Sequence, residues 1–492
     1  MKQALMVVGA TSHAGKSLLC AAICRLFARR GWRVTPFKGQ NMALNAYVTD
    51  TGDEIGYAQA VQAWAAGIAP TVEMNPILLK PQGDMTSQVI LNGKAVGHTQ
   101  AQQYYEQYFD RGWEAIKTAL ATLSESYDYI ICEGAGSPAE INLMHRDLTN
   151  MRVAQHLNAP TLLVVDIERG GCFAHIIGTL EILKQANAGH HLIKGIVINK
   201  FRGQESILQP GIKWVEDYTG IPVVGVIPYL KQVFPAEDSL DLLERRGRKP
   251  NTDLTIAIIH LPKISNFTDF DPLEAETSVN LRYISPEEDL GHPDAVIIPG
   301  SKTTIADLKT LQRTGMVKAL QNYVQGGGTV FGICGGFQML GEILNDPEGR
   351  EGEPGSYPGI SLFPLETIIT SEKLTRQREV KVKFPESSTL ITGYEIHQGR
   401  TRFTRHSQEL KPLFADAELG YINHNHSVWG CYLHGLFENG TWRRQWLNFL
   451  REKKGLSPLD INVPHYRQQR ELVLDTATDI IENHLDLEPL LL

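Results

Sequence analysis

The chain has 492 residues, more than one ordinary hydrophobic core accommodates, so we expect two or three domains. Hydrophobic residues make up 42% and charged residues 21%, which is typical of a soluble globular protein. The formal net charge of -8 and the pI near 6.1 argue against a polyanionic partner such as nucleic acid. They are compatible with a small charged ligand held in a locally basic pocket.

Neither membrane insertion nor secretion is indicated. The longest apolar runs, such as Thr161–Val165, are far too short to span a bilayer. The N-terminal strand enters a glycine loop and lacks the layout of a signal peptide. The cysteines form no C-x-x-C pair, so we expect reduced thiols in a cytoplasmic protein. They are Cys20, Cys24, Cys132, Cys172, Cys334 and Cys431.

The first part of the chain, residues 1–232, alternates short β-branched runs with amphipathic helical stretches. Buried runs separated by helices predict a mainly parallel sheet flanked by helices, an α/β domain. The predicted strands are Ala4–Val8, Arg33–Phe37, Tyr127–Cys132, Thr161–Val165, Gly195–Ile198 and Val223–Ile227.

A charged stretch with Pro and Gly predicts a linker at residues 233–252. A second α/β domain is expected at 253–451, and 452–492 is expected to be a helical tail with Arg467–His484 as its main helix. The second series of predicted strands comprises Thr255–Leu261, Ser278–Ile284, Ala295–Pro299, Thr329–Ile333, Gly393–His397 and Ser427–Leu433.

A glycine loop follows the first strand and has the spacing G-x5-G-K-S between Gly9 and Ser17. It opens a helix that we expect to reach about Arg30, with Gly31 as its C-terminal cap. Backbone N–H groups of such a loop, from Gly9 through Thr11 to Gly15, cradle phosphates. Lys16 would reach the terminal phosphates and Ser17 would ligate Mg²⁺. The loop therefore predicts a nucleoside triphosphate site, with a tight turn that binds nothing as the alternative.

The loop is one residue longer than the standard Walker A motif and resembles the dethiobiotin-synthetase branch of P-loop proteins, which activate carboxylates with ATP. Lys38, at the end of the second strand, could add a cation for phosphates or an acyl phosphate. Glu133 lies just past a buried strand, where sites of α/β proteins form, and a carboxylate there suits Mg²⁺. Asn199, after another buried strand, could face adenine. A solvated loop carboxylate is the alternative for Glu133.

Cys334 lies between an apolar run and two glycines, in Gly332-Ile-Cys-Gly-Gly336. This strand–turn–helix pattern is typical of a nucleophile elbow, and the start of the following helix favours the thiolate. A packing cysteine needs no such bare neighbours, which argues against an inert buried thiol. We expect Cys334 to be a nucleophile.

A nucleophilic cysteine needs a base, and His434 follows an apolar strand and precedes a glycine. His397, His424 and His426 are the competing candidates. The backbone N–H of Gly335 and the loop at Gly300 would supply the oxyanion hole.

The Cys334/His434 pair resembles that of the class I glutamine amidotransferases, in which the cysteine takes the amide of glutamine as a thioester and releases ammonia. The usual third member of that family is a Glu two residues beyond the His, and Leu436 occupies this position. Glu438 is nearby, but we do not assign it. The resemblance therefore implies a Cys/His pair, with the third acid open.

Across nearly its full length the chain resembles the cobyric acid synthase family of CobQ/CobB-type amidotransferases. Tyr57 stands where that family commonly has Arg, which puts a substrate role at this position in doubt. The segments that carry the resemblance are Lys38–Asn45, Glu54–Ala60, Met74–Pro81, Glu133–Asn142, Asp166–Gly171 and Tyr432–Asn439.

This resemblance implies a carbon–nitrogen ligase with ATP and glutamine as cosubstrates and Mg²⁺ as cofactor. The implied substrate is a corrinoid, adenosylcobyrinic acid a,c-diamide, amidated at its b, d, e and g carboxylates in cobalamin biosynthesis. Glu54 would join Ser17 and Glu133 as a metal ligand. The expected substrate-lining residues, any of which could be surface polar residues, are Asn41, Asn45, Gln59, Asn75, Lys80 and Gln88.

Three alternatives stay open on the sequence. Cobyrinic acid a,c-diamide synthases have the same two modules, and the segment Lys38–Asn45 favours the first assignment over them. A switch ATPase of the partitioning type would not need Cys334 and His434. A non-enzyme alternative is a glutamine-sensing module with an inactive amidotransferase domain. The oligomeric state is not predicted.

Overall fold

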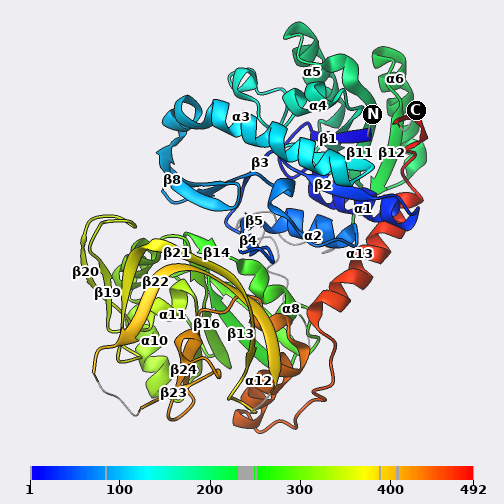
Figure 1. Ribbon diagram of the computed structural model, residues 1–492. Helices are drawn as coiled ribbons and strands as arrows, with labels where there is room; N and C mark the ends of the chain where they lie inside the picture. The colour runs from blue at the N-terminus through cyan, green and yellow to red at the C-terminus, as the bar shows by residue number, and fades with distance from the viewer. Residues whose placement is uncertain are drawn as a thin grey trace. The chain divides into compact units, whose positions relative to one another are not determined.

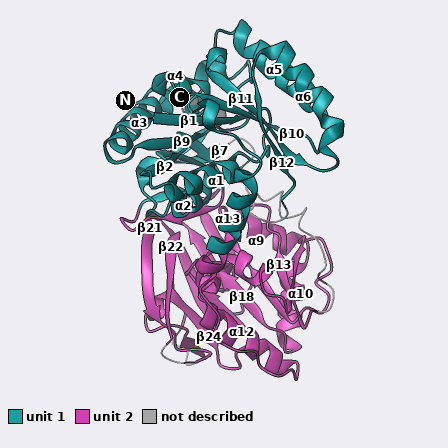
Figure 2. Cartoon of the chain, turned by 90° about the vertical axis from the view of Figure 1, so that its right-hand side faces the viewer, with its two compact units in different colours: residues 1–43, 53–235, 470–492 teal, residues 44–52, 236–469 magenta. Residues whose placement is uncertain are grey.

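The computed structural model describes residues 3–83, 86–230, 249, 252–386, 389–405 and 409–490. The contacts divide the chain into two compact units (Figures 1 and 2). Unit 1 holds residues 1–43, 53–235 and 470–492, and unit 2 holds 44–52 and 236–469. The predicted linker lies outside the described residues except for Lys249 and Thr252. The domain boundaries drawn from the sequence stay a prediction.

The centre of unit 1 is a parallel six-stranded sheet in the order β12-β11-β10-β1-β9-β2. Alternate residues of each strand enter two cores, so Leu5 and Val7 pack on one face and Met6 and Val8 on the other. Burial on both faces explains the continuous apolar runs in the sequence. The strands are β1 (Gln3–Gly9), β2 (Val34–Phe37), β9 (Tyr129–Glu133), β10 (Thr161–Asp166), β11 (Ile193–Phe201) and β12 (Val223–Pro228).

Helices cover both faces of this sheet. α1 (Lys16–Arg29) contributes Leu19, Ile23 and Phe27 to one core, and α3 (Ala101–Ser126) contributes Ile116 and Leu120 to the other. The other helices are α2 (Tyr57–Ala65), α4 (Met151–Leu157), α5 (Cys172–Gln185), α6 (Glu205–Thr219) and α13 (Tyr466–Glu482), the last belonging to unit 1 from residue 470 onward.

Unit 1 also has a small four-stranded sheet in the order β3-β6-β7-β8. β3 (Gln40–Met42) pairs in parallel with β6 (Ile77–Pro81), while β7 (Thr86–Leu91) and β8 (Lys94–Gln100) follow as antiparallel strands. The short strand β5 (Glu54–Gly56) precedes α2. The four-stranded sheet carries three of the six residues expected to line the substrate site, which are Asn41, Lys80 and Gln88.

Unit 2 is built on a seven-stranded sheet in the order β15-β13-β16-β18-β25-β24-β23. The first five strands are parallel and the last two antiparallel. These strands are β13 (Leu254–Ile259), β15 (Val279–Ile284), β16 (Ala295–Ile298), β18 (Val330–Ile333), β23 (Leu410–Pro412), β24 (Gly420–Asn423) and β25 (Val428–Cys431). The helices in the described part of unit 2 are α8 (Asp271–Glu274), α9 (Thr304–Arg313), α10 (Met316–Gln325), α11 (Gly335–Met339) and α12 (Gly440–Lys453).

A second sheet in unit 2 corrects one expectation. Gly393–His397 was expected to continue the α/β series, but it lies in β22 (Leu390–Phe403), which pairs antiparallel with the long β21 (Leu365–Lys381). β19 (Ile343–Asp346) and β20 (Gly355–Pro358) complete this sheet. Apolar periodicity indicates that a segment is a strand but not which strand it pairs with. The sequence therefore could not show that Gly393–His397 belongs to a second sheet.

With that exception the predicted strands lie where they were expected, and the two-domain α/β fold class is confirmed. Helix α1 ends at Arg29, and Gly31 has the left-handed φ of 80° expected beyond a helix end. The remaining short strands are β4 (Ala46–Val48), β14 (Ile264–Ser265) and β17 (Gly300–Ser301), all in unit 2.

Candidate functional site

Cys334 forms a strained corner between β18 and α11. Its φ of 50° and ψ of -107° are unusual for a residue with a side chain, and such strain collects at functional sites. The glycines allow the corner to pack tightly, because a Cβ added at Gly336 would lie 2.0 Å from the Ile298 carbonyl oxygen. The bare neighbours are therefore required by the close approach of the backbone.

His434 lies just beyond β25 and is buried, with 1% of its surface exposed. Its Nδ1 lies 2.7 Å from the Oδ2 of Asp269, whose Oδ1 accepts a hydrogen bond from the Gly435 N–H. Burial opposes the charged imidazolium, but the charges of Asp269 and Cys334 prevail and raise the pKa of His434 to about 10. Hydrogen bonds with both partners act in the same direction. The arrangement keeps a protonated imidazole beside the sulfur.

Asp269 is a carboxylate partner of His434 that sequence reasoning missed. It lies in a short 3-10 turn, Phe267–Phe270, far from His434 along the chain, and no local pattern marks it. The position two residues beyond His434 holds Leu436, which is buried in the apolar core. A search confined to the segment after the histidine therefore could not find the carboxylate.

The competing histidines have other partners. His397 stacks on Tyr432 with ring centroids 3.7 Å apart, and its Nδ1 lies 2.8 Å from the Gly399 carbonyl oxygen. Burial lowers its pKa, although Glu395 acts in the opposite direction. His426 packs on Phe384. His424 is exposed.

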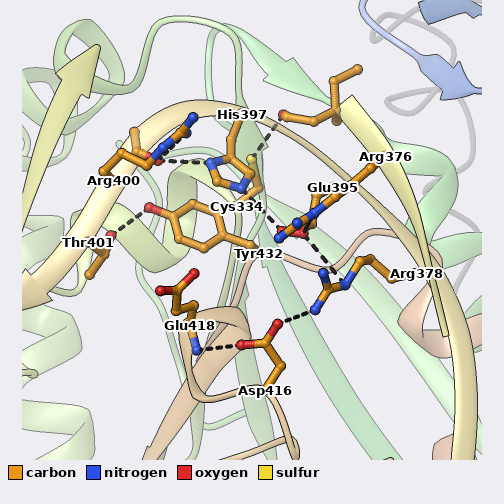
Figure 3. Close-up of polar contacts among 12 residues, drawn as sticks. Cys334, Arg376, Arg378, Glu395, His397, Arg400, Thr401, Asp416, Glu418 and Tyr432 are labelled. Carbon is orange, nitrogen blue, oxygen red and sulfur yellow. Dashed lines mark hydrogen bonds and ion pairs between the residues drawn. The ribbon is translucent and has the colours of Figure 1, made fainter. Parts of the chain in front are cut away.

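A charged cluster from β21 and β22 lies beside Cys334 and was also not foreseen (Figure 3). The Cys334 Sγ lies 3.7 Å from the Ile396 carbonyl oxygen. Burial would raise the pKa of the neighbouring Glu395, but His397, whose Nε2 lies 3.8 Å from Oε1, and the hydrogen bonds and charge of Arg376 lower it to about 2. Glu395 is therefore a fixed negative charge close to the thiol.

The expected oxyanion-hole residues border the same corner. A Cβ added at Gly335 would lie 2.8 Å from the backbone nitrogen of Ser301, and one added at Gly300 would lie 3.3 Å from the His434 ring. Their role in binding an oxyanion stays a prediction.

The backbone of the glycine loop in unit 1 is held by the side chains of Asn199 and Lys16. Gly15 has a left-handed φ of 94°, and a Cβ added there would lie 2.1 Å from the amide nitrogen of Asn199. That amide donates to the Ala14 carbonyl oxygen at 2.8 Å, so Asn199 supports the loop. The Lys16 Nζ lies 3.4 Å from the Thr11 carbonyl oxygen, folded over the loop that begins at Gly9. The role of Asn199 toward adenine stays a prediction.

Glu133 is the centre of a buried network beside this loop. Its Oε1 accepts from the Ser17 hydroxyl at 2.7 Å and from the Lys38 ammonium at 2.8 Å, and its Oε2 accepts from Gln62 at 2.6 Å. Burial alone would raise the pKa of Glu133, but the Lys38 charge and these hydrogen bonds outweigh it and lower the pKa. Gln62, which the sequence did not single out, helps to keep this carboxylate ionised.

The residues suit a magnesium ion bound together with phosphates. Mg²⁺ prefers a few hard oxygen ligands and keeps several waters, and Ser17 and the ionised Glu133 offer such oxygens next to the loop. No cluster of three or more His, Cys, Asp or Glu side chains that could hold a metal occurs among the residues described. Glu54 instead pairs with Lys80 at 2.8 Å, and its role as a metal ligand stays a prediction.

The expected substrate-lining residues are all buried, so the alternative that they are surface polar groups does not hold. Asn41 donates to Gln59 at 2.9 Å, and Lys80 lies opposite Gln88 in the small sheet. Asn75 donates to the Lys38 and Ile77 carbonyl oxygens and accepts from the Gly56 N–H, so it also supports the backbone.

Asn45 and Tyr57 have surroundings that the sequence did not predict. Asn45 belongs to unit 2, and both polar atoms of its buried amide lack a hydrogen-bond partner. Tyr57 accepts a hydrogen bond at 2.7 Å from Arg470, whose guanidinium also lies 4.2 Å from the Trp64 ring centroid. Arg470 of α13 thus contacts Tyr57, the position at which the family commonly has arginine.

Comparison with known proteins defines the class of the two units. Residues 5–243 match the CobQ/CobB/MinD/ParA nucleotide binding domain, and residues 255–442 match the CobB/CobQ-like glutamine amidotransferase domain.

No helix in the described ranges is long and apolar enough to cross a membrane.

Proteins that match nearly the whole chain identify its family within this class. The chain is 64% identical to the cobyric acid synthase of Nostoc sp. (strain PCC 7120) over 491 residues, covering 99% of each chain. It is 62% identical to that of Trichodesmium erythraeum over 489 residues, covering 99% of this chain and 100% of the relative. The chain therefore belongs to the cobyric acid synthase family, and it is a ligase of the glutamine amidotransferase type.

Proposed function

We propose that the chain converts adenosylcobyrinic acid a,c-diamide to adenosylcobyric acid by amidating the b, d, e and g carboxylates. Each amidation uses one glutamine and one ATP. The observation that supports this most is the pairing, in one chain of this family, of a Cys334–His434–Asp269 constellation with the glycine-loop site around Lys16 and Glu133.

Glutamine is hydrolysed at Cys334. The sulfur attacks the side-chain amide carbon, the C–N bond breaks, and the His434 imidazolium gives its proton to the leaving nitrogen, so that ammonia departs and a thioester remains. Neutral His434 then takes a proton from water, which hydrolyses the thioester to glutamate. Asp269 holds the imidazole in orientation and favours its charged form.

The carboxylate of the corrinoid is activated in unit 1. Transfer of the γ-phosphoryl group makes the carboxyl carbon electrophilic, ammonia attacks it, and inorganic phosphate leaves. Lys16 and Lys38 offset the negative charge that develops on the phosphoryl group. Ser17 and Glu133 would hold the Mg²⁺, which supplies charge neutralisation to the phosphates when bound.

Mass spectrometry of the products tests this proposal. Purified protein is incubated with adenosylcobyrinic acid a,c-diamide, ATP, Mg²⁺ and glutamine. Four successive replacements of OH by NH₂ are expected, each requiring ATP. No change to the diamide, together with amidation of cobyrinic acid at two positions in a parallel incubation, would instead support a cobyrinic acid a,c-diamide synthase. ATP turnover without any amide product would support a switch ATPase.

A further inference from the structure

The segment of residues 44–52 is held in unit 2 although its two ends continue into strands of unit 1. It follows β3, which carries Asn41, and precedes β5, which carries Glu54. The Thr375 hydroxyl donates to the Gly52 carbonyl oxygen at 2.8 Å, and the Gln377 amide donates to the Val48 carbonyl oxygen. Side chains of the long strand β21 thus fix the second half of the segment.

The first half of the segment is fixed at the carbonyl oxygen of Ala46. This oxygen accepts from the Asn266 amide at 2.9 Å and from the Tyr394 hydroxyl at 3.1 Å. The same Asn266 amide donates to the Tyr394 hydroxyl at 3.0 Å. Asn266 is 1% exposed and Tyr394 is 5% exposed, so these three hydrogen bonds are shielded from water.

Tyr394 also contacts His434, and Asn266 also contacts Asp269. The backbones of Tyr394 and His434 exchange two hydrogen bonds, of 3.1 and 2.9 Å, and their rings stack with centroids 5.5 Å apart. Asn266 precedes the 3-10 turn of Asp269, and its carbonyl oxygen accepts from the Asp269 N–H at 3.0 Å. Asn266 therefore contacts the Ala46 carbonyl and Asp269, and Tyr394 contacts the Ala46 carbonyl and His434.

We infer that Asn266 and Tyr394 are positioning residues that orient Asp269 and His434 through their hydrogen bonds to Ala46 in the segment 44–52. This inference rests on the glutaminase step proposed above and identifies the residues that orient His434 and Asp269 for that step. Displacement of Ala46 would break two buried hydrogen bonds and release the Tyr394 ring from its position on His434.

Two conservative variants remove these hydrogen bonds without straining the chain. Asn266 has a left-handed φ of 51°, which glycine adopts freely, so Asn266→Gly deletes only the side chain. Tyr394→Phe keeps the ring and loses the hydroxyl. Tyr323→Phe is the matched control, because the Tyr323 hydroxyl also donates to a backbone carbonyl in unit 2, that of Pro293, and neither residue is assigned to the site.

The readout is glutamate release from glutamine without a corrinoid, measured as kcat and KM. Each test variant should lower kcat about fivefold, the loss that one net hydrogen bond supports, with KM changed less than twofold. The double variant should lose less than the product of the single losses, because the Asn266 amide donates to the Tyr394 hydroxyl. Tyr323→Phe should leave kcat unchanged.

Ammonia-supported amidation by the same variants separates this inference from the proposed function. That activity should stay within twofold of the wild type, because it bypasses Cys334. Wild-type protein that makes no amide from either nitrogen donor contradicts the proposed function. Full kcat for glutamine in both variants, or independent losses in the double variant, overturns the positioning role, as does an equal loss with both donors.

Discussion

At the residue scale, candidate side chains marked by a local sequence motif could be predicted. A partner side chain that folding brings from a distant segment could not. Cys334 was proposed as a nucleophile because of its flanking glycines, and one of them, Gly336, closely approaches the Ile298 backbone. His434 was proposed as the base because it follows a buried strand. Asp269 comes from a distant turn and left no trace near either residue. Contacts between distant segments depend on tertiary packing, which periodicity and motif spacing do not report.

The contacts of His434 and His397 predict different effects on Cys334. His434→Ala removes the imidazolium that favours the thiolate, so iodoacetamide should alkylate Cys334 roughly tenfold more slowly near neutral pH. His397→Ala should change the rate less than twofold, because His397 is held by Tyr432 and Gly399. The rates are read by peptide mass spectrometry. Slower alkylation only in His397→Ala would transfer the role of the base to that residue.

The raised pKa of His434 also predicts how stability changes with pH. A histidine whose folded-state pKa, about 10, exceeds its ordinary value of 6.5 stabilises the fold fully below about pH 6.5 and progressively loses that contribution as the pH rises toward 10. Asp269→Asn removes the main charge responsible, so the thermal midpoint of unit 2 should fall less between pH 6.5 and pH 10 than in the wild type. Calorimetry at several pH values measures this difference. Parallel curves would show that Asp269 does not set the charge of His434.

At the element scale, strands and helices were predicted well, but their partners were not. β22 was correctly read as a strand at Gly393–His397 and wrongly placed in the α/β series, since antiparallel pairing with β21 is a long-range choice. The C-terminal helix was also found, whereas its ion pairs with α1 could not be anticipated. Arg25 and Arg29 of α1 pair with Glu471, Asp475 and Asp479 of α13.

These ion pairs predict a measurable contribution to the stability of unit 1. Arg25 is largely shielded and contacts both Glu471 and Asp475, so Arg25→Gln should destabilise unit 1 by about 1 kcal/mol. Arg33, which pairs with Asp128 at the exposed surface, provides the matched control, and Arg33→Gln should leave the unfolding midpoint nearly unchanged. Denaturant unfolding, with the ATP-stabilised transition assigned to unit 1, makes the comparison. Equal effects of the two substitutions would contradict a role for α13 in holding this unit.

At the scale of the whole molecule, one chain holds two candidate sites, and we expect that either can lose its activity without the other. The glycine loop with Glu133 and the cysteine corner with His434 each have their own buried network. The sequence could indicate both candidate sites because each has a compact motif at a strand end, and the roles of their residues stay predictions. It did not predict that residues 44–52, between two strands of one unit, have their contacts in the other, because the segment has no composition that marks it.

The independence of the two sites is tested most directly by exchanging the nitrogen donor in Cys334→Ser, with Lys16→Ala as the reciprocal variant. Cys334→Ser should lose glutamine-supported amidation by at least about a hundredfold and keep ammonia-supported amidation within about twofold. Lys16→Ala should lose amidation with both donors and still release glutamate from glutamine. Equal loss with glutamine and ammonia in Cys334→Ser, or sustained ATP-dependent amidation in Lys16→Ala, would contradict the account.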